Sequence, residues 1–419
     1  MRRGLITLLA ATVLAAVAPA AAHAADARFA TFNASLNRGS EGQLVADLAN
    51  PSADTVRVRQ ARNVAEVIQR AAPDVLLVNE FDFVAGGEAA RLFRDNFLRV
   101  PQNGAPAADY PYFYVAPVNT GVPSGFDLDN NGDTNADDAN NDAWGFGAFP
   151  GQFGMVVYSK YPIEEAGVRR FQHFLWKDMP GSRIPRPFYS PEEVAEFPLS
   201  SKSHWDVPVH IGKRTVHFLV SHPTPPVFDG PEDRNGLRNA DEIRFWADYV
   251  TPGRGGYVYD DEGGRGGLHA SALFVVAGDQ NSDPLDGDSL RDADGDPIAI
   301  QPLLNSPRVN SRSTPSSAGA AEASDLQGGA NDNHLGDPQF DTADFSDTAP
   351  GNLRADYVLP SRQIKVADSA VFWPVRSDPL FRLTGVFDNA TWGGPNGVGG
   401  FPTSDHRLVW ADLDLPGVR

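Results

Sequence analysis

Short apolar runs, each bounded by turn-forming residues, recur along the chain and predict buried β-strands. The best defined is at residues 273–278, which leads directly into Asp279 and Asn281. A run of this length is too short for a membrane span and indicates a strand that is buried on both faces. Gly278 allows a sharp turn, so that Asp279 and Asn281, two residues apart, are expected to point together into a cleft. An isolated Gly-Asp-x-Asn is also typical of a strand that ends in a simple turn.

The same criterion predicts further strands, and apolar residues at intervals of three and four predict amphipathic helices. The predicted strands lie at residues 28–33, 75–78, 110–115, 153–159, 204–209, 215–221, 356–359 and 407–415, and the predicted helices at residues 56–71 and 237–250. The strands at 204–209 and 215–221 are expected to form a hairpin that turns at Gly212 and Lys213.

Polar residues stand at the ends of these predicted strands. They are Asn33, Glu80, His222, Asp279, Asn281, Asp356, Asp405 and His406. A single carboxylate or histidine at a strand end is usually exposed or structural. Eight such residues indicate a common rim where strand ends converge.

The first 24 residues have the layout of a secretory signal peptide. Arg2 and Arg3 precede an apolar run at residues 5–17, and Ala22-His23-Ala24 is a small-residue cleavage site. The apolar run is too short for a transmembrane anchor, so we expect a secreted protein, extracellular or periplasmic, that uses the general route in preference to the twin-arginine route. Cysteine is absent, so rigidity must come from a large core or from bound metal.

Residues 25–419 are predicted to form a single domain with insertions near 101–150, 171–201, 305–350 and 376–400. The formal net charge is −19 and the isoelectric point is near 4.8, which argues against broad attraction to nucleic acid or to an anionic membrane. A polyanionic substrate stays open, because a bound divalent cation and a few arginines can reverse the field locally. An acidic surface kept for solubility explains the charge equally simply.

Residues 127–138 reproduce the spacing of a calcium loop. Oxygen-bearing side chains stand at Asp127, Asp129, Asn131, Asp133, Asn135 and Asp138, with Gly132 at the sharp turn. Ca²⁺ takes about six to eight oxygen ligands, and a chain that coils around it presents every second residue inward. Because Asp138 stands where glutamate is usual and no helix pair flanks the loop, we predict a structural Ca²⁺ site; an Asp/Asn-rich disordered loop is the alternative. The acidic stretch at 292–296 is interpreted as a solvated turn in preference to a second calcium loop.

Several motifs, taken in order, resemble those of the endonuclease/exonuclease/phosphatase superfamily, which includes pancreatic-type deoxyribonucleases, abasic-site endonucleases, neutral sphingomyelinases and inositol polyphosphate 5-phosphatases. The matching motifs are Thr-Phe-Asn at 31–33, Asn-Glu at 79–80, Gly-Met-Val-Val-Tyr-Ser-Lys-Tyr-Pro-Ile at 154–163, Ser-His at 221–222, Gly-Asp-Gln-Asn at 278–281, Arg-Ala-Asp-Tyr-Val-Leu at 354–359 and Ser-Asp-His at 404–406. Asn79 replaces the usual glutamine and Ala355 a bulkier apolar residue. The resemblance implies an α/β fold, a four-layered α-β-β-α sandwich of two mostly antiparallel sheets with long surface insertions.

Phosphoester hydrolysis requires a neutralised phosphate, a positioned water and a proton or charge for the leaving oxygen. Glu80 is predicted to bind a catalytic Mg²⁺ or Mn²⁺ ion, with Asn33 and Asp405 completing or orienting that metal site. Asp279 is predicted to orient and deprotonate the attacking water.

The remaining strand-end residues are assigned to the phosphate. Asn281 and His222 are predicted to hold phosphate oxygens. Asp356 is predicted to fix the tautomer of His406 and to raise its pKa, which favours the charged imidazole that stabilises the transition state.

The expected function is therefore an exported, metal-dependent phosphoesterase, a monomer without a stable protein partner, whose substrate is open among nucleic acid, phospholipid and small phosphate esters. The basic residues that a nuclease cleft would use are scattered along the chain: Lys160, Arg183, Arg186, Lys202 and Arg354. A lipid phosphodiesterase would expose an apolar hairpin, for which residues 171–176 are candidates, although core packing explains them equally well. The alternative from another class is a calcium-stabilised, catalytically silent surface or binding protein on the same fold; retention of every catalytic position counts against it.

Overall fold

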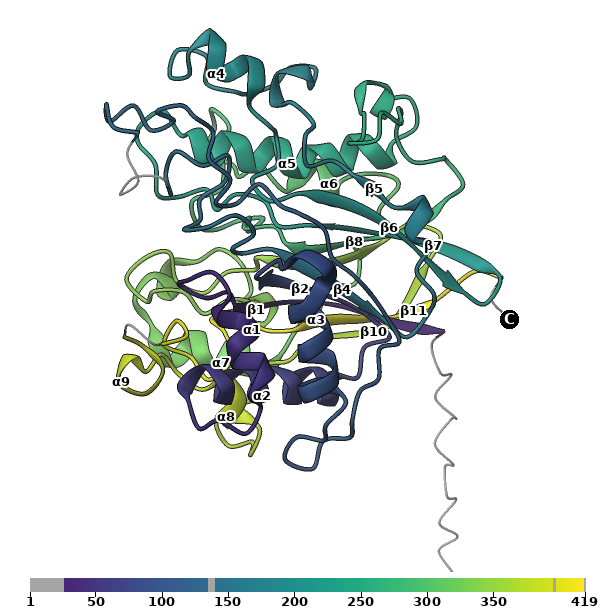
Figure 1. Ribbon diagram of the computed structural model, residues 1–419, viewed down its shortest axis with the longest axis vertical. Helices are drawn as coiled ribbons and strands as arrows, with labels where there is room; N and C mark the ends of the chain where they lie inside the picture. Colours follow the sequence, from purple (N-terminus) through teal and green to yellow (C-terminus); the bar gives the residue numbers. More distant parts are fainter. Residues whose placement is uncertain (1–25, 135–139, 395–396, 418–419) are drawn as a thin grey trace, which may run out of the picture.

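The computed structural model describes residues 26–134, 140–394 and 397–417. Within these residues two β-sheets lie face to face, and helices cover both outer faces (Figure 1). The six-stranded sheet has the order β10-β11-β1-β2-β4-β3, and the five-stranded sheet has the order β5-β6-β7-β8-β9. The strands are β1 (Ala27–Leu36), β2 (Val75–Phe81), β3 (Tyr112–Tyr114), β4 (Met155–Ser159), β5 (Arg169–Arg170), β6 (His204–Ile211), β7 (Arg214–Ser221), β8 (Leu273–Asp279), β9 (Asp356–Pro360), β10 (Lys365–Val371) and β11 (Val409–Asp414).

One strand pair in each sheet is parallel, β1 with β2 and β7 with β8, and the other described pairs are antiparallel. The expected sandwich of two mostly antiparallel sheets is thus confirmed. Parallel neighbours carry their carboxyl ends to the same edge of a sheet. Each sheet therefore ends two adjacent strands at one edge, and β1 and β2 of one sheet contact β8 of the other.

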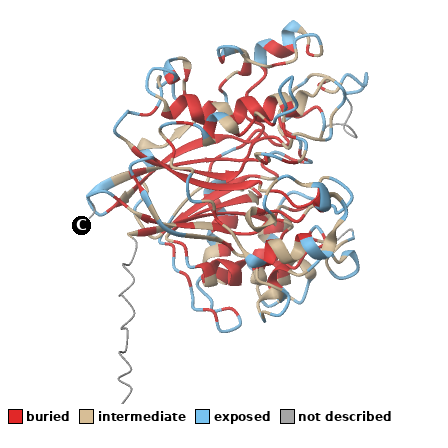
Figure 2. Ribbon diagram, turned by 180° about the vertical axis from the view of Figure 1, so that it is seen from behind, coloured by how far each residue is buried: buried red, intermediate tan, exposed pale blue. Residues whose placement is uncertain are grey.

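Alternation of side chains along the strands divides the interior into three apolar layers. Figure 2 shows that most of the residues in the central strands of both sheets are buried. On β1, Phe29 faces the other sheet and meets Phe218 of β7 edge-on at 5.4 Å, whereas Ala30 and Phe32 face the helices. Because successive side chains of a strand point to opposite faces, strands that are covered on both sides must be apolar throughout. This explains why the central strands consist of continuous apolar runs in the sequence.

Helices α1 (Gln43–Ala49), α2 (Val56–Ala71) and α3 (Glu88–Phe93) cover the six-stranded sheet, and α5 (Arg234–Val250) and α6 (Gln301–Leu304) cover the other. Helix α2 has the predicted bounds. Its N-cap Thr55 accepts a hydrogen bond from the backbone N–H of Val58, and Ala72 ends it in the left-handed conformation. Helix α5 begins three residues before its predicted start at Leu237, because its first turn, Arg-Asn-Gly, carries no apolar residue.

The segments predicted as insertions contain short elements joined by irregular chain. These are η4 (Trp176–Asp178), α4 (Pro191–Glu196), α7 (Ala318–Gln327), η6 (Gly329–Asn333), η7 (Pro338–Phe340), α8 (Phe381–Thr384) and α9 (Asn389–Trp392). The remaining short helices are η1 (Ala85–Gly87), η2 (Arg94–Leu98), η3 (Glu165–Gly167) and η5 (Gly255–Tyr257).

The structure decides between the alternative interpretations of residues 171–176 and of residues 292–296. Phe171, Phe174 and Trp176 are buried, so core packing accounts for this stretch and an exposed membrane hairpin does not. Residues 292–296 form the predicted turn, in which the N–H of Gly295 donates to the carbonyl of Asp292.

The amino-terminal segment that we interpret as a signal peptide lies outside the described residues. In the part of the chain that the structure describes, no helix combines the length and the apolar character that a membrane span requires.

Candidate active site

All eight strand-end residues singled out in the sequence lie at one edge of the sandwich. Four are at the carboxyl ends of the two parallel pairs: Asn33 on β1, Glu80 on β2, His222 directly after β7, and Asp279 at the end of β8. Strands β9 and β11 run antiparallel to β8 and β1, so their starts lie at the same edge. The beginning of β9 brings Asp356, the approach to β11 brings Asp405 and His406, and the turn after β8 brings Asn281.

Three residues of the site, Gly278, Glu80 and Asn281, have unusual backbone conformations. Gly278 has a φ of +143°, and a Cβ at this position would stand 2.0 Å from the carbonyl oxygen of Ser221, so that only glycine fits between β7 and β8. Glu80 and Asn281 have φ values of 56° and 49°, in the left-handed region that residues with a Cβ seldom occupy. Such conformations persist where the surrounding structure enforces them, and they are frequent in functional sites.

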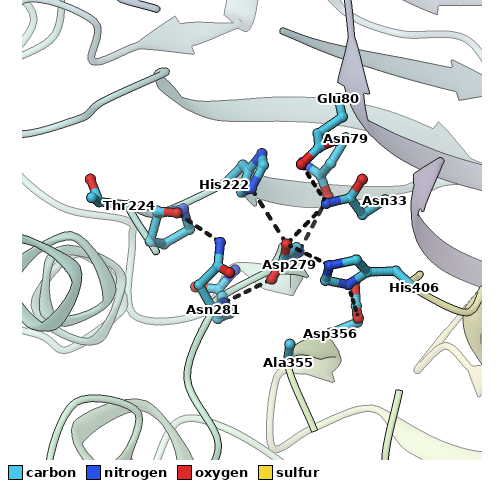
Figure 3. A network of polar contacts seen from close by, with 12 residues as sticks. Asn33, Asn79, Glu80, His222, Thr224, Asp279, Asn281, Ala355, Asp356 and His406 are labelled. Atoms are coloured by element: carbon cyan, nitrogen blue, oxygen red, sulfur yellow. Dashed lines mark hydrogen bonds and ion pairs between the residues drawn. The ribbon is translucent and has the colours of Figure 1, made fainter. Parts of the chain in front are cut away.

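Asp279 is the centre of the polar network in Figure 3, and only 1% of its surface is exposed to solvent. Its Oδ1 accepts a hydrogen bond from the backbone N–H of Asn281 at 2.8 Å. Its Oδ2 accepts one from Asn33 Nδ2 at 3.1 Å and lies 3.4 Å from His222 Nε2 and 3.6 Å from His406 Nε2. Asn33 Nδ2 also lies 3.0 Å from Glu80 Oε1, so one amide links the two carboxylates.

Burial alone would raise the pKa of Asp279, but the charge of His406 and the hydrogen bonds from His222 and Asn33 hold that pKa below its usual range. Asp279 is therefore an ionised acceptor.

His406 is held from behind by Asp356. Its Nδ1 lies 2.8 Å from Asp356 Oδ2, which also accepts a hydrogen bond from the Thr342 hydroxyl at 2.8 Å. This arrangement places the Nδ1 hydrogen on the Asp356 side and directs Nε2 to Asp279. Burial would lower the pKa of His406, but the carboxylates of Asp356 and Asp279 raise it well above its ordinary value. His406 is therefore a cation in this site.

The pKa of the second histidine, His222, is shifted in the opposite direction from that of His406. Burial, together with the nearby charge of Lys202, lowers the pKa of His222 to about 4, despite its contact with Asp279. At neutral pH the site therefore holds one neutral and one charged imidazole on the same carboxylate. Titratable groups whose pKa values are driven apart in this way are typical of acid–base sites.

Glu80 and Asp405 form the side of the site that suits a cation. Burial and the charge of Asp405 together raise the pKa of Glu80 to about 7. A divalent ion would offset the repulsion that raises the pKa of Glu80, and hard oxygen ligands suit Mg²⁺.

Ligand atoms of Asp279, Asp356 and His406 also lie within 4.8 Å of one another, so this group could hold a metal. In this structure both ring nitrogens of His406 face carboxylates, Nε2 at 3.6 Å from Asp279 and Nδ1 at 2.8 Å from Asp356.

The structure adds Lys202, which the sequence presented only as one of several scattered basic residues. Lys202 is 6% exposed and precedes β6. Burial lowers its pKa, and the charges of Glu242, Glu80 and Asp279 oppose that effect. Lys202 therefore lies buried near the carboxylates of the site, at a position that no local pattern marks.

Three of the other basic candidates are engaged elsewhere. Lys160 lies 2.9 Å from Asp74, Arg183 lies 2.6 Å from Asp241, and the guanidinium of Arg354 lies over the ring of Tyr357 at 4.5 Å.

Asn79, one of the two departures from the family pattern, joins the two sheets behind the site. Its Oδ1 accepts a hydrogen bond from the backbone N–H of Asp279 at 3.2 Å, and its Nδ2 donates to the carbonyl of Ser221 at 3.4 Å. Asn79 therefore positions the ends of β7 and β8.

The predicted calcium loop lies on the surface, apart from this network. Carboxylate oxygens of Asp127, Asp129 and Asp142 lie within 4.8 Å of one another, and Asp142 is a member that the sequence spacing did not indicate. Gly132 has a φ of +86° and donates its N–H to Asp127, as expected for the sharp turn. The predicted ligands Asn135 and Asp138 lie outside the described residues.

The model of a family described as "Endonuclease/Exonuclease/phosphatase family" matches residues 30–406. No curated protein matches the sequence.

Solved structures with similar folds include an endonuclease/exonuclease/phosphatase from Beutenbergia cavernae, with 16% identity, 94% of this chain and 72% of that chain covered and a TM-score of 0.45. They also include a mutant beta toxin from Staphylococcus aureus with bound magnesium ions. The two sequences are 12% identical, the match covers 92% of this chain and 99% of that chain, and the TM-score is 0.43. A third is a mannosyl-6-phosphatase from Bacteroides thetaiotaomicron. It is 11% identical, the match covers 93% of this chain and 100% of that chain, and the TM-score is 0.41.

Proposed function

The chain belongs to the endonuclease/exonuclease/phosphatase family, and from this premise we propose that it is a divalent-metal-dependent phosphoesterase. The observation that carries the proposal is the position of Asp279. Its carboxylate lies between a neutral His222 and a cationic His406, and Asn33 links it to Glu80. A site of this composition supplies an acceptor for water, a positive charge for the phosphate and ligands for a metal.

A Mg²⁺ or Mn²⁺ ion held by Glu80 and Asp405 would neutralise charge on the phosphoryl oxygens and on the leaving oxygen. Asn33 orients the Glu80 carboxylate through its 3.0 Å hydrogen bond. The charge of the ion would also lower the raised pKa of Glu80 and so favour its ionised form.

Asp279 accepts a hydrogen bond from the attacking water and so directs its lone pair to phosphorus. As the new O–P bond forms, the proton of the water passes to Asp279 and the bond to the alcohol oxygen breaks. The negative charge of the bound phosphate raises the pKa of Asp279 from its low value and makes it a better base.

The two histidines stabilise the added negative charge in different ways. His406, charged and held by Asp356, attracts the equatorial oxygens as charge accumulates on them. His222 is neutral, and its single N–H, which faces Asp279 in this structure, would turn to a phosphate oxygen when the substrate binds. Asn281, whose Nδ2 now donates to the carbonyl of Pro223 at 3.1 Å, is placed to hold a phosphate oxygen.

The test is an assay panel of plasmid DNA, bis-p-nitrophenyl phosphate, sphingomyelin and phytate with Mg²⁺, Mn²⁺ or Ca²⁺. We expect turnover of at least one substrate by the parent and a loss of at least about 10³-fold in Asp279→Asn, which removes the charge and keeps the shape. Asp294→Asn, a change at an exposed turn, is the matched control. Equal turnover by Asp279→Asn and the parent would refute the role of Asp279.

We also propose that the protein is exported and that Ca²⁺ binds at residues 127–142. Export is supported by the basic, apolar and small-residue segments that follow one another in residues 1–24. Amino-terminal sequencing of protein recovered outside the cytoplasm should find a chain that begins near residue 25. The calcium proposal is supported by the spacing of Asp127 and Asp129 and by their closeness to Asp142.

A further inference from the structure

A groove of about 760 Å³ leads away from the catalytic site. It begins at Asp405 and runs between two groups of residues that are far apart in the sequence. One lies within residues 326–348, and the other consists of Arg376, Val386, Phe387, Gly399 and Phe401. In Figure 1 these segments lie in the region of α7, α8 and α9, at the lower left. The size falls within the range of about 300–1,000 Å³ that is usual for small-molecule sites.

Part of the groove wall is formed by exposed apolar side chains. Leu326, Val386 and Phe387 are 54%, 44% and 64% exposed, which places them among the most exposed large apolar side chains in the described residues. A group of exposed apolar side chains typically marks a binding surface.

Aromatic rings connect this wall to the catalytic histidine. Phe345 meets the ring of His406 edge-on, with centroids 5.2 Å apart. Farther along the groove, the ring of Phe387 lies 5.8 Å from that of Phe401, which is buried and supports it. A group bound to phosphorus at His406 would therefore enter the groove past Phe345 and meet Phe387.

The charges in the groove do not suit a polyanion. Among the described residues that line it, the acidic ones are Asp344, Asp347 and Asp405, and the basic one is Arg376. Asp344 is neutralised by Arg407, 2.8 Å away, and Asp405 belongs to the metal side of the catalytic site. A nucleic-acid strand needs a succession of basic side chains along its phosphates, and this groove offers a single guanidinium.

We propose that this groove binds the alcohol part of the phosphoester substrate and selects an uncharged aromatic or apolar alcohol over a nucleotide chain. The inference rests on the proposed function, since it takes the phosphoryl group to lie between Asp279 and His406. Phe387 acts as a specificity-determining residue that contacts the alcohol and not the phosphorus.

The experiment measures binding separately from turnover. Phenylphosphonate, methylphosphonate and a short oligothymidylate are titrated by calorimetry into the full-length protein with Mg²⁺ present, and inorganic phosphate is used as the competitor that places them at the phosphoryl site. We expect phenylphosphonate to bind about tenfold or more tightly than methylphosphonate, because one ring leaves water. Phe387→Ala should reduce this ratio by about threefold or more.

Two further variants complete the design. Leu326→Ala, on the same wall, should also reduce the phenyl-to-methyl ratio. Tyr112→Ala is the matched control: Tyr112 is 40% exposed and lies on β3, opposite Ser159, at the end of the sandwich away from the catalytic edge. It should leave the ratio unchanged.

The outcomes separate this inference from the proposed function. Equal affinity for the two phosphonates, a ratio unchanged in both groove variants, or tighter binding of the oligothymidylate would overturn the groove assignment, even if the protein hydrolyses esters. A phenyl preference that depends on Phe387 would support the groove even if every ester tested resists hydrolysis, and in that case the proposed catalysis alone would fail.

Discussion

His406 and Asp356, which are 50 positions apart in the chain, lie 2.8 Å from each other through Nδ1 and Oδ2. The pair lies behind the reacting face, since Nε2 of the same ring is 3.6 Å from Asp279. A carboxylate in this position sets both the tautomer and the charge of the imidazole. The catalytic arrangement thus depends on a buried residue that cannot itself reach the substrate.

Asp356→Asn should lower kcat by roughly 10²- to 10⁴-fold, because an amide neither stabilises the imidazolium nor fixes its tautomer. The measurement is kcat and KM on the best substrate of the assay panel. Asp206→Asn is a matched control, since Asp206 is also buried, contacts His217 Nδ1 at 2.7 Å and accepts a hydrogen bond from the Tyr249 hydroxyl at 2.6 Å. It is expected to affect stability and to leave the turnover of folded protein intact; comparable losses of kcat in both variants would contradict a specific role for Asp356.

Glu80→Gln should weaken metal activation. The amide keeps the size of the side chain but loses the charge that attracts the ion, so the Mg²⁺ concentration for half-maximal activity should rise by about tenfold or more. Titration of activity with Mg²⁺, together with calorimetry in the absence of substrate, measures the effect. Glu88→Gln, on an exposed residue at the start of α3, is the control, and an unchanged Mg²⁺ requirement in Glu80→Gln would move the metal site elsewhere.

Stability should depend on pH through His204, which is remote from the metal ligands. Its ring nitrogens lie 3.1 Å from the Ser200 hydroxyl and 2.9 Å from the Glu242 carbonyl, and burial lowers its pKa to about 4. In the unfolded chain the pKa of histidine is about 6.5, so between about pH 6.5 and pH 4 the unfolded state takes up a proton that the folded state does not. The stabilisation present above pH 6.5 is therefore lost as the pH falls towards 4.

The comparison that isolates this effect is with His204→Gln. From pH 7 to pH 4 the free energy of unfolding of the parent should fall by about 3 kcal/mol more than that of the variant. Chemical denaturation at several pH values measures both. Parallel pH profiles for the two proteins would show that His204 does not titrate as its burial implies.

Chelation of Ca²⁺ should lower the melting temperature. A ligand present at about 100 times its Kd stabilises the folded state by about 2.7 kcal/mol, which corresponds to several degrees for a chain of this size. EGTA should produce this decrease in the parent but not in Asp127→Asn or Asp142→Asn, which start from a lower melting temperature. Asp294→Asn should respond as the parent does, and a parent melt that EGTA leaves unchanged would count against the calcium loop.

Much of this architecture can be predicted from the chain alone. Helix α2 has the bounds that its 3.6-residue periodicity predicts, and the buried strands β2, β4, β7 and β8 contain the predicted apolar runs, because burial on both faces leaves few polar positions. Strand β10 was missed for the converse reason: it is an edge strand whose residues are mostly exposed or half-buried, so no apolar run marks it. The eight strand-end residues that the sequence indicated likewise lie at one edge of the sandwich.

What only the tertiary structure decided are contacts between segments that share no local pattern. Lys202 enters the site from an irregular stretch, Asp142 joins the calcium loop from beyond its motif, and Phe345 and Phe387 face one groove from separate insertions. Periodicity and spacing report on the neighbours of a residue along the chain, so they predict elements and their ends. The charge environment of a buried group and the shape of a surface groove depend on residues hundreds of positions away, and only the folded chain brings these together.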